Sequence, residues 1–211
     1  MVAEQIQEQV KANNEFKIFD LYSMDGIQIK DVALRPHINL QGKLLLRSGT
    51  RKKFEKYASM KEHIVLRLAR RVGVPGHVGK KHKIITNWAP GKYSKNMRSV
   101  LTALEIVAKR TGKNPVQVLV TAIENGSPRD EITVIEHAGA RYPQAVDCSP
   151  MRRINLALRW MTQGAYQKAF GKKSKIAETL AKEIVSASEG NMESYAFGKK
   201  NESEKQADSA R

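Results

Sequence analysis

Residues 131–153 read EITVIEHAGARYPQAVDCSPMRR, and this stretch decides the fold. Residues 131–147 indicate a β-hairpin, because two seven-residue strands flank the three-residue loop AGA at 138–140, whose central glycine can take a positive φ. Ser149 then offers a helix cap, and Pro150 suits the first turn of a helix. The stretch therefore predicts a hairpin that leads directly into a helix.

Helical periodicity lies on both sides of this hairpin. Apolar residues recur every three or four positions in segments bounded by glycine, proline or capping residues, at about 59–73, 97–111, 115–126, 150–169 and 174–190. The letters SMKE at the start of the first segment fit a capping box. These patterns predict a mainly α fold, a helical bundle-like domain with one protruding β-hairpin between two helices.

The chain divides into three parts by composition. Residues 1–58 are basic and mostly without periodicity, which predicts a largely irregular N-terminal extension. Residues 59–190 hold the helical core with its hairpin, and residues 191–211 are polar, which predicts a C-terminal helix or tail. Within the core, residues 73–95 form a basic loop of a length that is typical of functional or disordered segments.

Positive charge is the strongest clue to a partner. The 211 residues carry 37 lysines and arginines against 21 acids, a net charge of +16, and between Lys43 and Arg98 only Glu55 and Glu62 oppose 16 basic residues. Such a chain typically binds a polyanion, either nucleic acid or an anionic membrane. The chain shows neither an apolar run of about 18 residues nor a secretory signal, so we expect nucleic acid and no membrane.

The basic clusters also contain aromatic residues. Tyr57, Trp88 and Tyr93 lie among them. Cations neutralise phosphates, and aromatic rings stack on unpaired bases, so this combination favours RNA. A solvated charged surface is the alternative for any single cluster, but it does not explain several clusters with so few acids among them.

Enzyme chemistry finds little support in the sequence. A phosphate-binding loop at Gly79-Lys80-Lys81 fails, because Val74 stands where a glycine is needed and Lys81 where serine or threonine is needed. The five histidines are scattered, without a cysteine pair to complete a metal site. Cys148 could be activated at a helix N-terminus, but burial beneath the hairpin is the preferred interpretation. We therefore expect no catalytic, cofactor-binding or metal-binding residues and no small-molecule substrate.

Two other functions remain as alternatives. The short breaks at Gly112 and Gly126 would permit a helix-turn-helix protein that binds DNA, although the hairpin and the spread of basic clusters fit it poorly. An RNA-modifying enzyme would need Cys148 or a carboxylate at its centre, and no base or ligand set accompanies either.

Three stretches carry a resemblance to a known family: TGKNPVQVLVTAIENGSPRDE at 111–131, ARYPQAVDCSPMRRINLALRW at 140–160 and KIAETLAKEIVSASEG at 175–190. The chain resembles the ribosomal protein of the small-subunit head called protein seven in bacteria and protein five in eukaryotes. Its extended N-terminal region and the letters YPQAVD look archaeal or eukaryotic. The resemblance implies a non-enzymatic, cytoplasmic ribosomal protein that binds the 3′ major domain of small-subunit rRNA and nucleates head assembly. Exit-site tRNA, mRNA and other head proteins would be its neighbours.

Basic residues in the clusters, together with those that match the family, form the predicted rRNA-binding set. This set comprises Arg51, Lys52, Lys53, Arg70, Arg71, Lys80, Lys81, Lys83, Lys92, Lys95, Arg98, Arg152, Arg153, Arg159, Lys172 and Lys173. The resemblance also implies a group near tRNA and mRNA, which comprises Gly139, Arg141, Tyr142 and Arg211. The family usually has a shorter turn at residues 73–95, where this chain carries the additional letters NWAP at 87–90.

Overall fold

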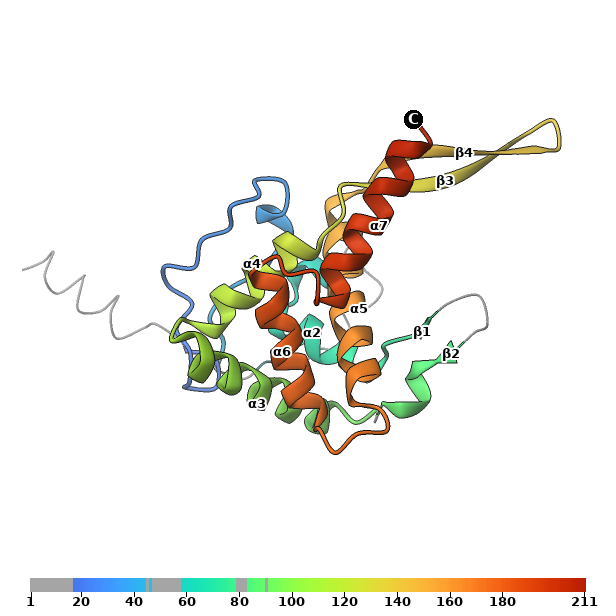
Figure 1. Ribbon diagram of the computed structural model, residues 1–211. Helices are drawn as coiled ribbons and strands as arrows, with labels where there is room; N and C mark the ends of the chain where they lie inside the picture. Colours follow the sequence, from blue (N-terminus) through green and yellow to red (C-terminus); the bar gives the residue numbers. More distant parts are fainter. Residues whose placement is uncertain (1–16, 45, 47–57, 79–82, 90) are drawn as a thin grey trace, which may run out of the picture.

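The computed structural model describes residues 17–44, 46, 58–78, 83–89 and 91–211. Its α-helices are α2 (Ile64–Gly73), α3 (Tyr93–Thr111), α4 (Pro115–Gly126), α5 (Pro150–Ala169), α6 (Ile176–Ser188) and α7 (Tyr195–Ser209). Strands β3 (Asp130–His137) and β4 (Ala140–Asp147) form an antiparallel hairpin that stands away from the helices (Figure 1). The predicted mainly α fold with a protruding hairpin is confirmed. Within the described ranges, no helix has the length and apolarity to cross a membrane.

Helix α6 occupies the middle of the bundle. It packs against α3, α4 and α5, and its apolar face is buried through Leu180, Ala181, Ile184 and Ala187. Each fully buried leucine or isoleucine contributes about 1.5–3 kcal/mol of transfer free energy. The bundle therefore depends on this face of α6.

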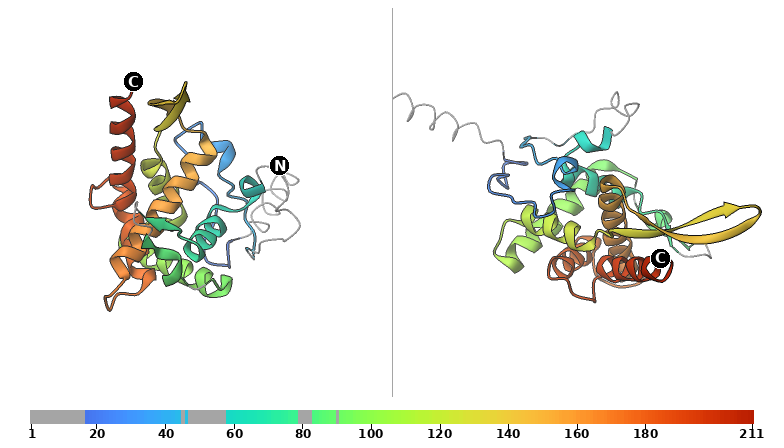
Figure 2. Two further views of the ribbon diagram at one scale, coloured as in Figure 1. Left: turned by 90° about the vertical axis from the view of Figure 1, so that its right-hand side faces the viewer. Right: turned by 90° about the horizontal axis from the view of Figure 1, so that it is seen from above.

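The sequence predicts either a helix or a tail for residues 191–211, and the structure has a helix there, α7. It is a helix that packs against α5 and the base of β3, so that the chain ends beside the hairpin (Figure 2). The Ser194 side chain caps it by accepting from the Phe197 N–H, and only the small residues Ala196 and Ala207 are buried within it. A helix that buries only alanines has almost no amphipathic pattern. The sequence therefore could not distinguish a helix from a tail at this end of the chain.

The hairpin turn is one residue shorter than the sequence indicates. His137 pairs with Ala140, so that the loop contains only Ala138 and Gly139, with φ values of 49° and 80°. Two positive φ values are typical of the two-residue type I′ turn, which matches the natural twist of antiparallel strands.

The start of α2 also differs from the prediction. Residues Ala58–Lys61 form a short 3-10 turn, and His63 caps the helix by accepting from the Val65 N–H at 3.2 Å through Nδ1. The capping box is wrong because Glu62 pairs with Arg70 instead of capping. Helix α3 likewise begins four residues before the expected Met97.

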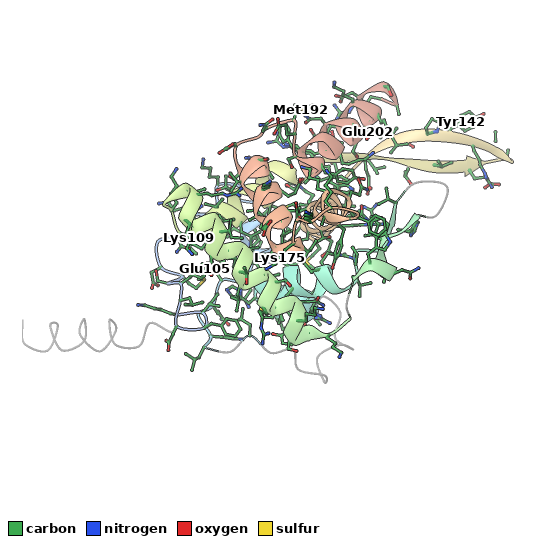
Figure 3. The ribbon with its side chains drawn as sticks, turned by 60° about the horizontal axis from the view of Figure 1, so that its bottom comes forward. Glu105, Lys109, Tyr142, Lys175, Met192 and Glu202 are labelled. Carbon is green, nitrogen blue, oxygen red and sulfur yellow. The ribbon has the colours of Figure 1, made fainter. Side chains whose placement is uncertain are left out.

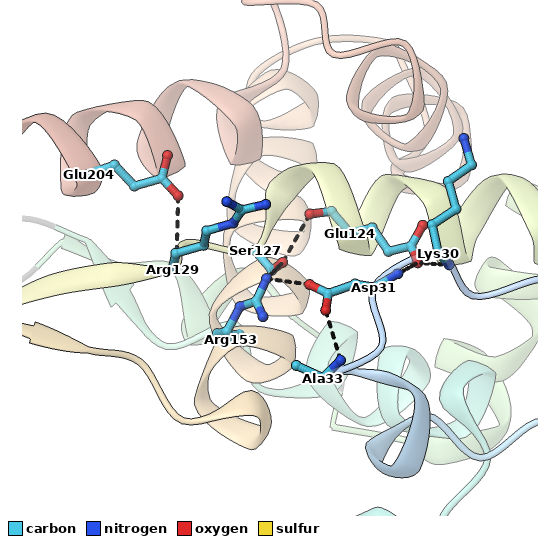
Figure 4. A network of polar contacts seen from close by, with 8 residues as sticks. All are labelled: Lys30, Asp31, Ala33, Glu124, Ser127, Arg129, Arg153 and Glu204. Carbon is cyan, nitrogen blue, oxygen red and sulfur yellow. Dashed lines mark hydrogen bonds and ion pairs between the residues drawn. The ribbon is translucent and has the colours of Figure 1, made fainter.

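The described N-terminal residues lie on the core. Residues 17–44 are irregular except for the 3-10 turn Arg35–His37, and Ile18 and Leu34 are fully buried. Glu124 on α4 accepts hydrogen bonds from the backbone of Lys30 and Asp31 at 2.7 and 3.0 Å (Figure 4). This part of the extension is therefore bound to the bundle by its backbone and by its few large apolar residues.

Gly164 allows α5 and α7 to approach closely. A Cβ at this position would lie 2.6 Å from the Cβ of Tyr195 and 3.2 Å from the Glu183 Cδ. We expect Gly164→Ala to lower the free energy of unfolding by about 1–2 kcal/mol, because overpacking outweighs the gain in helix propensity. Urea unfolding measures this change. Gly198→Ala is the matched control and should be stabilising or neutral, since the nearest atom is the Met192 carbonyl oxygen at 4.0 Å; equal losses in both variants would contradict the packing argument.

Candidate nucleic-acid interface

A cleft of about 260 Å³ lies between α2 and α5. We call it the arginine cleft, because Arg67, Arg70 and Arg71 line it together with Asn155 and Glu62. The last turn of α2 carries Arg70 and Arg71, where the negative end of the helix dipole favours cations. The sequence predicted Arg70 and Arg71 as RNA-binding residues, and the structure places both at this cleft.

Arg67 is a structural residue of the cleft that the sequence analysis missed. It is 5% exposed and donates to the His37 carbonyl oxygen at 2.9 Å and to the Asn155 Oδ1 at 3.2 Å. Burial lowers the pKa of its guanidinium to about 10. Arg67 thereby joins the N-terminal segment, α2 and α5, and it fixes the position of the helix that carries Arg70 and Arg71.

Arg71 lines the arginine cleft, and Arg159 on α5 lies outside its lining but close enough to act on the charge of Arg71. Burial, and then the positive charge of Arg159, lowers the pKa of the Arg71 guanidinium. Among the residues that the structure describes, no carboxylate forms an ion pair with either of them, whereas Arg70 pairs with Glu62. Two neighbouring cations without an acid are unfavourable alone and are stabilised by a bound anion. This arrangement suits a phosphate group.

Helix α5 positions the basic loop that follows α2. Gln163, 3% exposed, donates through Nε2 to the carbonyl oxygens of Pro75 and His77 at 2.9 and 3.3 Å, and Arg159 donates to the same His77 oxygen at 3.3 Å. The Tyr166 hydroxyl donates to the Val72 carbonyl oxygen at 2.8 Å, and burial raises its pKa to about 12. These contacts fix the loop beside the arginine cleft.

Two short strands lie within residues 73–95, the segment that the sequence predicts as a basic loop, either functional or disordered. Strands β1 (His77–Val78) and β2 (Lys83–Ile84) pair in antiparallel fashion. The predicted RNA-binding residues Lys80 and Lys81 lie outside the described residues, as do Arg51, Lys52, Lys53 and the side chain of Lys83. Their predicted role stays a prediction.

A second group of predicted residues gathers near the start of α3 and the turn between α5 and α6. Lys92, Lys95 and Arg98 are exposed at the first part of α3, and Lys172 and Lys173 are exposed in the turn. The side chain of Lys95 lines a cleft that also contains Phe170 and Gly171. The structure therefore brings lysines nearly 80 positions apart in the sequence to one side of the bundle.

Arg152 and Arg153 have different environments. Arg152 is exposed and pairs with Glu131 at the hairpin base. Arg153 is only 8% exposed and donates to the Asp31 Oδ2 at 2.7 Å and to the Ser127 Oγ at 3.4 Å (Figure 4). The N-terminal segment thus covers Arg153 at this end of α5 and leaves Arg152 exposed, and the predicted role of both residues in binding rRNA stays a prediction.

The Asp31–Arg153 pair makes the stability of the N-terminal segment depend on pH. Burial raises the pKa of Asp31, but the hydrogen bond and charge of Arg153 and the Ala33 N–H outweigh burial, so its pKa lies below the ordinary 3.8. A lowered folded-state pKa adds stability above the ordinary value, and this stability is lost as the pH falls below it. We expect the difference in unfolding free energy between wild type and Asp31→Asn to be constant from about pH 7 to 5 and to shrink below about pH 4. Urea unfolding at each pH measures this; Asp25→Asn, at an exposed turn, should show no such trend.

The residues predicted to lie near tRNA and mRNA are found at opposite ends of the hairpin. Gly139, Arg141 and Tyr142 lie at or beside its tip, and Tyr142 is 60% exposed, far from Lys175 on the bundle (Figure 3). Arg211 instead pairs with Asp130, which lies at the base of the hairpin. The structure therefore does not bring Arg211 together with the three tip residues.

Cys148 is a buried residue beneath the hairpin, as preferred from the sequence. It is 8% exposed, and burial together with the charge of Glu131 raises the pKa of its thiol to about 11. A thiol with this pKa remains protonated near neutral pH and is a poor nucleophile. Within the described part of the chain, no group of three histidine, cysteine or acidic side chains is arranged to hold a metal ion.

Comparison with known proteins extends over almost the whole chain. Residues 47–211 match the protein family described as ribosomal protein S7p/S5e. The chain is 43% identical over 197 residues to small ribosomal subunit protein uS7 of Nanoarchaeum equitans (strain Kin4-M), covering 93% of this chain and 100% of that relative. It is 39% identical over 193 residues to the uS7 protein of Methanothermobacter thermautotrophicus (strain Delta H), covering 92% and 98%.

Proposed function

Because the chain belongs to the ribosomal protein S7p/S5e family, with archaeal relatives, we propose that it binds the head domain of small-subunit rRNA through its arginine cleft. Family membership establishes a structural, non-enzymatic role in the small ribosomal subunit. The proposal adds the ligand domain and the surface. The resemblance seen in the sequence, to a ribosomal protein of the small subunit, is confirmed.

One observation carries the choice of surface. Arg71 lines the arginine cleft, Arg159 lies close enough to lower its pKa, and no carboxylate among the described residues forms an ion pair with either of them. Phosphate contacts supply most of the affinity of such proteins, and the geometry of folded RNA supplies much of the selectivity. The exposed lysines at the start of α3 and in the α5–α6 turn enlarge the basic surface for a folded RNA.

The hairpin supports the finer part of the proposal, namely that its tip lies beside exit-site tRNA and departing mRNA. Val134 and Tyr142 are each 60% exposed near the tip. An isolated hairpin is marginally stable in water, so exposed apolar residues on a projecting hairpin indicate a partner surface. Other head proteins would contact the remaining exposed surface, and binding of the rRNA would nucleate assembly of the head.

Competition between RNA and DNA tests the proposal. The full chain is titrated with a transcript of the rRNA head domain at several salt concentrations, with duplex DNA of equal length as competitor. We expect tighter binding to the transcript at every salt concentration, because the protein recognises RNA shape as well as charge. Equal affinities would favour the DNA-binding alternative. Normal incorporation of Cys148→Ala into subunits would remove the alternative of an RNA-modifying enzyme centred on this thiol.

A further inference from the structure

An aromatic cleft of about 360 Å³ is lined by residues of α2, α3, α5 and α6 and of the segments that precede α3 and follow α5. Val72, Trp88, Lys95, Tyr166 and Phe170 contribute to its lining. The rings of Trp88 and Phe170 stack with centroids 3.7 Å apart and an interplanar angle of 12°. Phe170 is 57% exposed, so much of its ring surface remains accessible.

Both rings stand on anchored backbone. Trp88 ends the 3-10 turn Ile85–Trp88, in which Ile85 is fully buried and its N–H donates to the Gly76 carbonyl oxygen at 3.0 Å. Phe170 directly follows α5, and its N–H donates to the Tyr166 carbonyl oxygen at 2.9 Å. The two rings are therefore already in position before a ligand binds, so binding does not carry the free-energy cost of ordering them.

Positive charge lies at this cleft. Among the described residues that line it, Lys95 is the only charged one, and Lys172 and Lys173 follow within three positions of Phe170. An apolar side chain from a partner protein would need no cations here, whereas a nucleotide would use both parts, its base on the rings and its phosphates on the lysines.

We infer that the aromatic cleft binds an unpaired nucleotide of single-stranded RNA, whose base stacks on the Trp88–Phe170 pair while Lys95 and Lys172 neutralise the adjacent phosphates. This inference rests on the proposed function and deepens it, because it identifies a site for an unpaired base. The hydroxyl of Ser99 in the lining already donates to the Lys95 carbonyl oxygen at 3.0 Å. Stacking on the rings does not distinguish one base from another, so this part of the binding tolerates any base.

Tryptophan fluorescence tests the site directly. The chain has two tryptophans, so Trp160→Phe leaves Trp88 as the only one. Titration with hexauridylate or hexaadenylate should quench Trp88 to saturation, and Phe170→Ala in the same background should weaken binding by about 5- to 100-fold, the cost of one lost base stack. Leu21→Ala, which truncates a residue of equal exposure (58%) elsewhere, should leave binding unchanged. If Trp160→Phe does not fold, the difference in quenching between wild type and Trp88→Phe gives the same information.

The outcomes separate the two proposals. Absent quenching by the oligonucleotides, with intact binding of the rRNA transcript, would overturn the aromatic site and leave the proposed function standing. Failure to bind the transcript at all would overturn the proposed function. Loss of a neighbouring protein from reconstituted subunits carrying Phe170→Ala, without any oligonucleotide binding by the wild type, would make the occupant a protein and would also overturn the inference.

Discussion

Replacing Glu183 by alanine should lower the free energy of unfolding by about 2–5 kcal/mol, because two buried donors each lose their acceptor. Glu183 is fully buried in α6. Its carboxylate accepts from the Lys168 Nζ at 2.7 Å, the Ser194 hydroxyl at 2.8 Å and the Ala196 N–H at 3.1 Å. One side chain thus joins α5 and α6 to the first turn of α7. Alanine would leave the two buried donors, the Ser194 hydroxyl and the Ala196 N–H, without this acceptor, whereas Lys168 is partly exposed to water.

Urea unfolding of the two variants Glu183→Ala and Glu189→Ala makes the measurement. Glu189 is exposed at the end of the same helix, so its replacement should change stability by no more than about 0.5 kcal/mol. Glu183→Gln keeps an acceptor oxygen and should lose less than alanine. Similar stabilities of the Glu183→Ala and Glu189→Ala variants would show that the buried carboxylate does not hold α7 in place.

The second large effect concerns RNA affinity. Replacing Arg70, Arg71 and Arg159 together by alanine should reduce the salt dependence of rRNA binding by about 0.7–0.9 per lost phosphate contact. If all three contacts are lost, affinity at 0.1 M salt should fall on the order of 100-fold. Arg159 also donates to the loop carbonyl of His77, so circular dichroism and urea unfolding should accompany the binding curves to show that the variant is folded.

A charge-matched control separates this site from net charge. Arg110, Lys113 and Lys205 are exposed outside both clefts, and replacing them by alanine removes the same three charges. We expect a much smaller change in the salt slope from this variant. Equal slopes for the two triple variants would mean that the chain binds RNA by general charge alone and would contradict the role of the arginine cleft.

Local signals were sufficient for the hairpin and for most helices. Asn114 caps α4 by accepting from the Val116 N–H at 3.0 Å, and Pro115 takes the first position, as their order in the sequence indicates. The turn of the β3–β4 hairpin was predicted one residue too long, because Ala138 accepts a positive φ that a sequence pattern assigns only to glycine. These features depend on neighbours within about four residues, which is the range that a sequence pattern covers.

The sequence by itself therefore determined the helical fold, the projecting hairpin, the excess of positive charge and the family. Only the tertiary structure decided which basic residues can reach a ligand. Arg152 and Arg153 are adjacent in the sequence, yet one is exposed and the other is paired with Asp31, 122 positions away. The same packing brings Arg159 to Arg71 and Phe170 to Trp88. Exposure depends on which distant segment covers each side of a helix, and a local pattern contains no information about that segment.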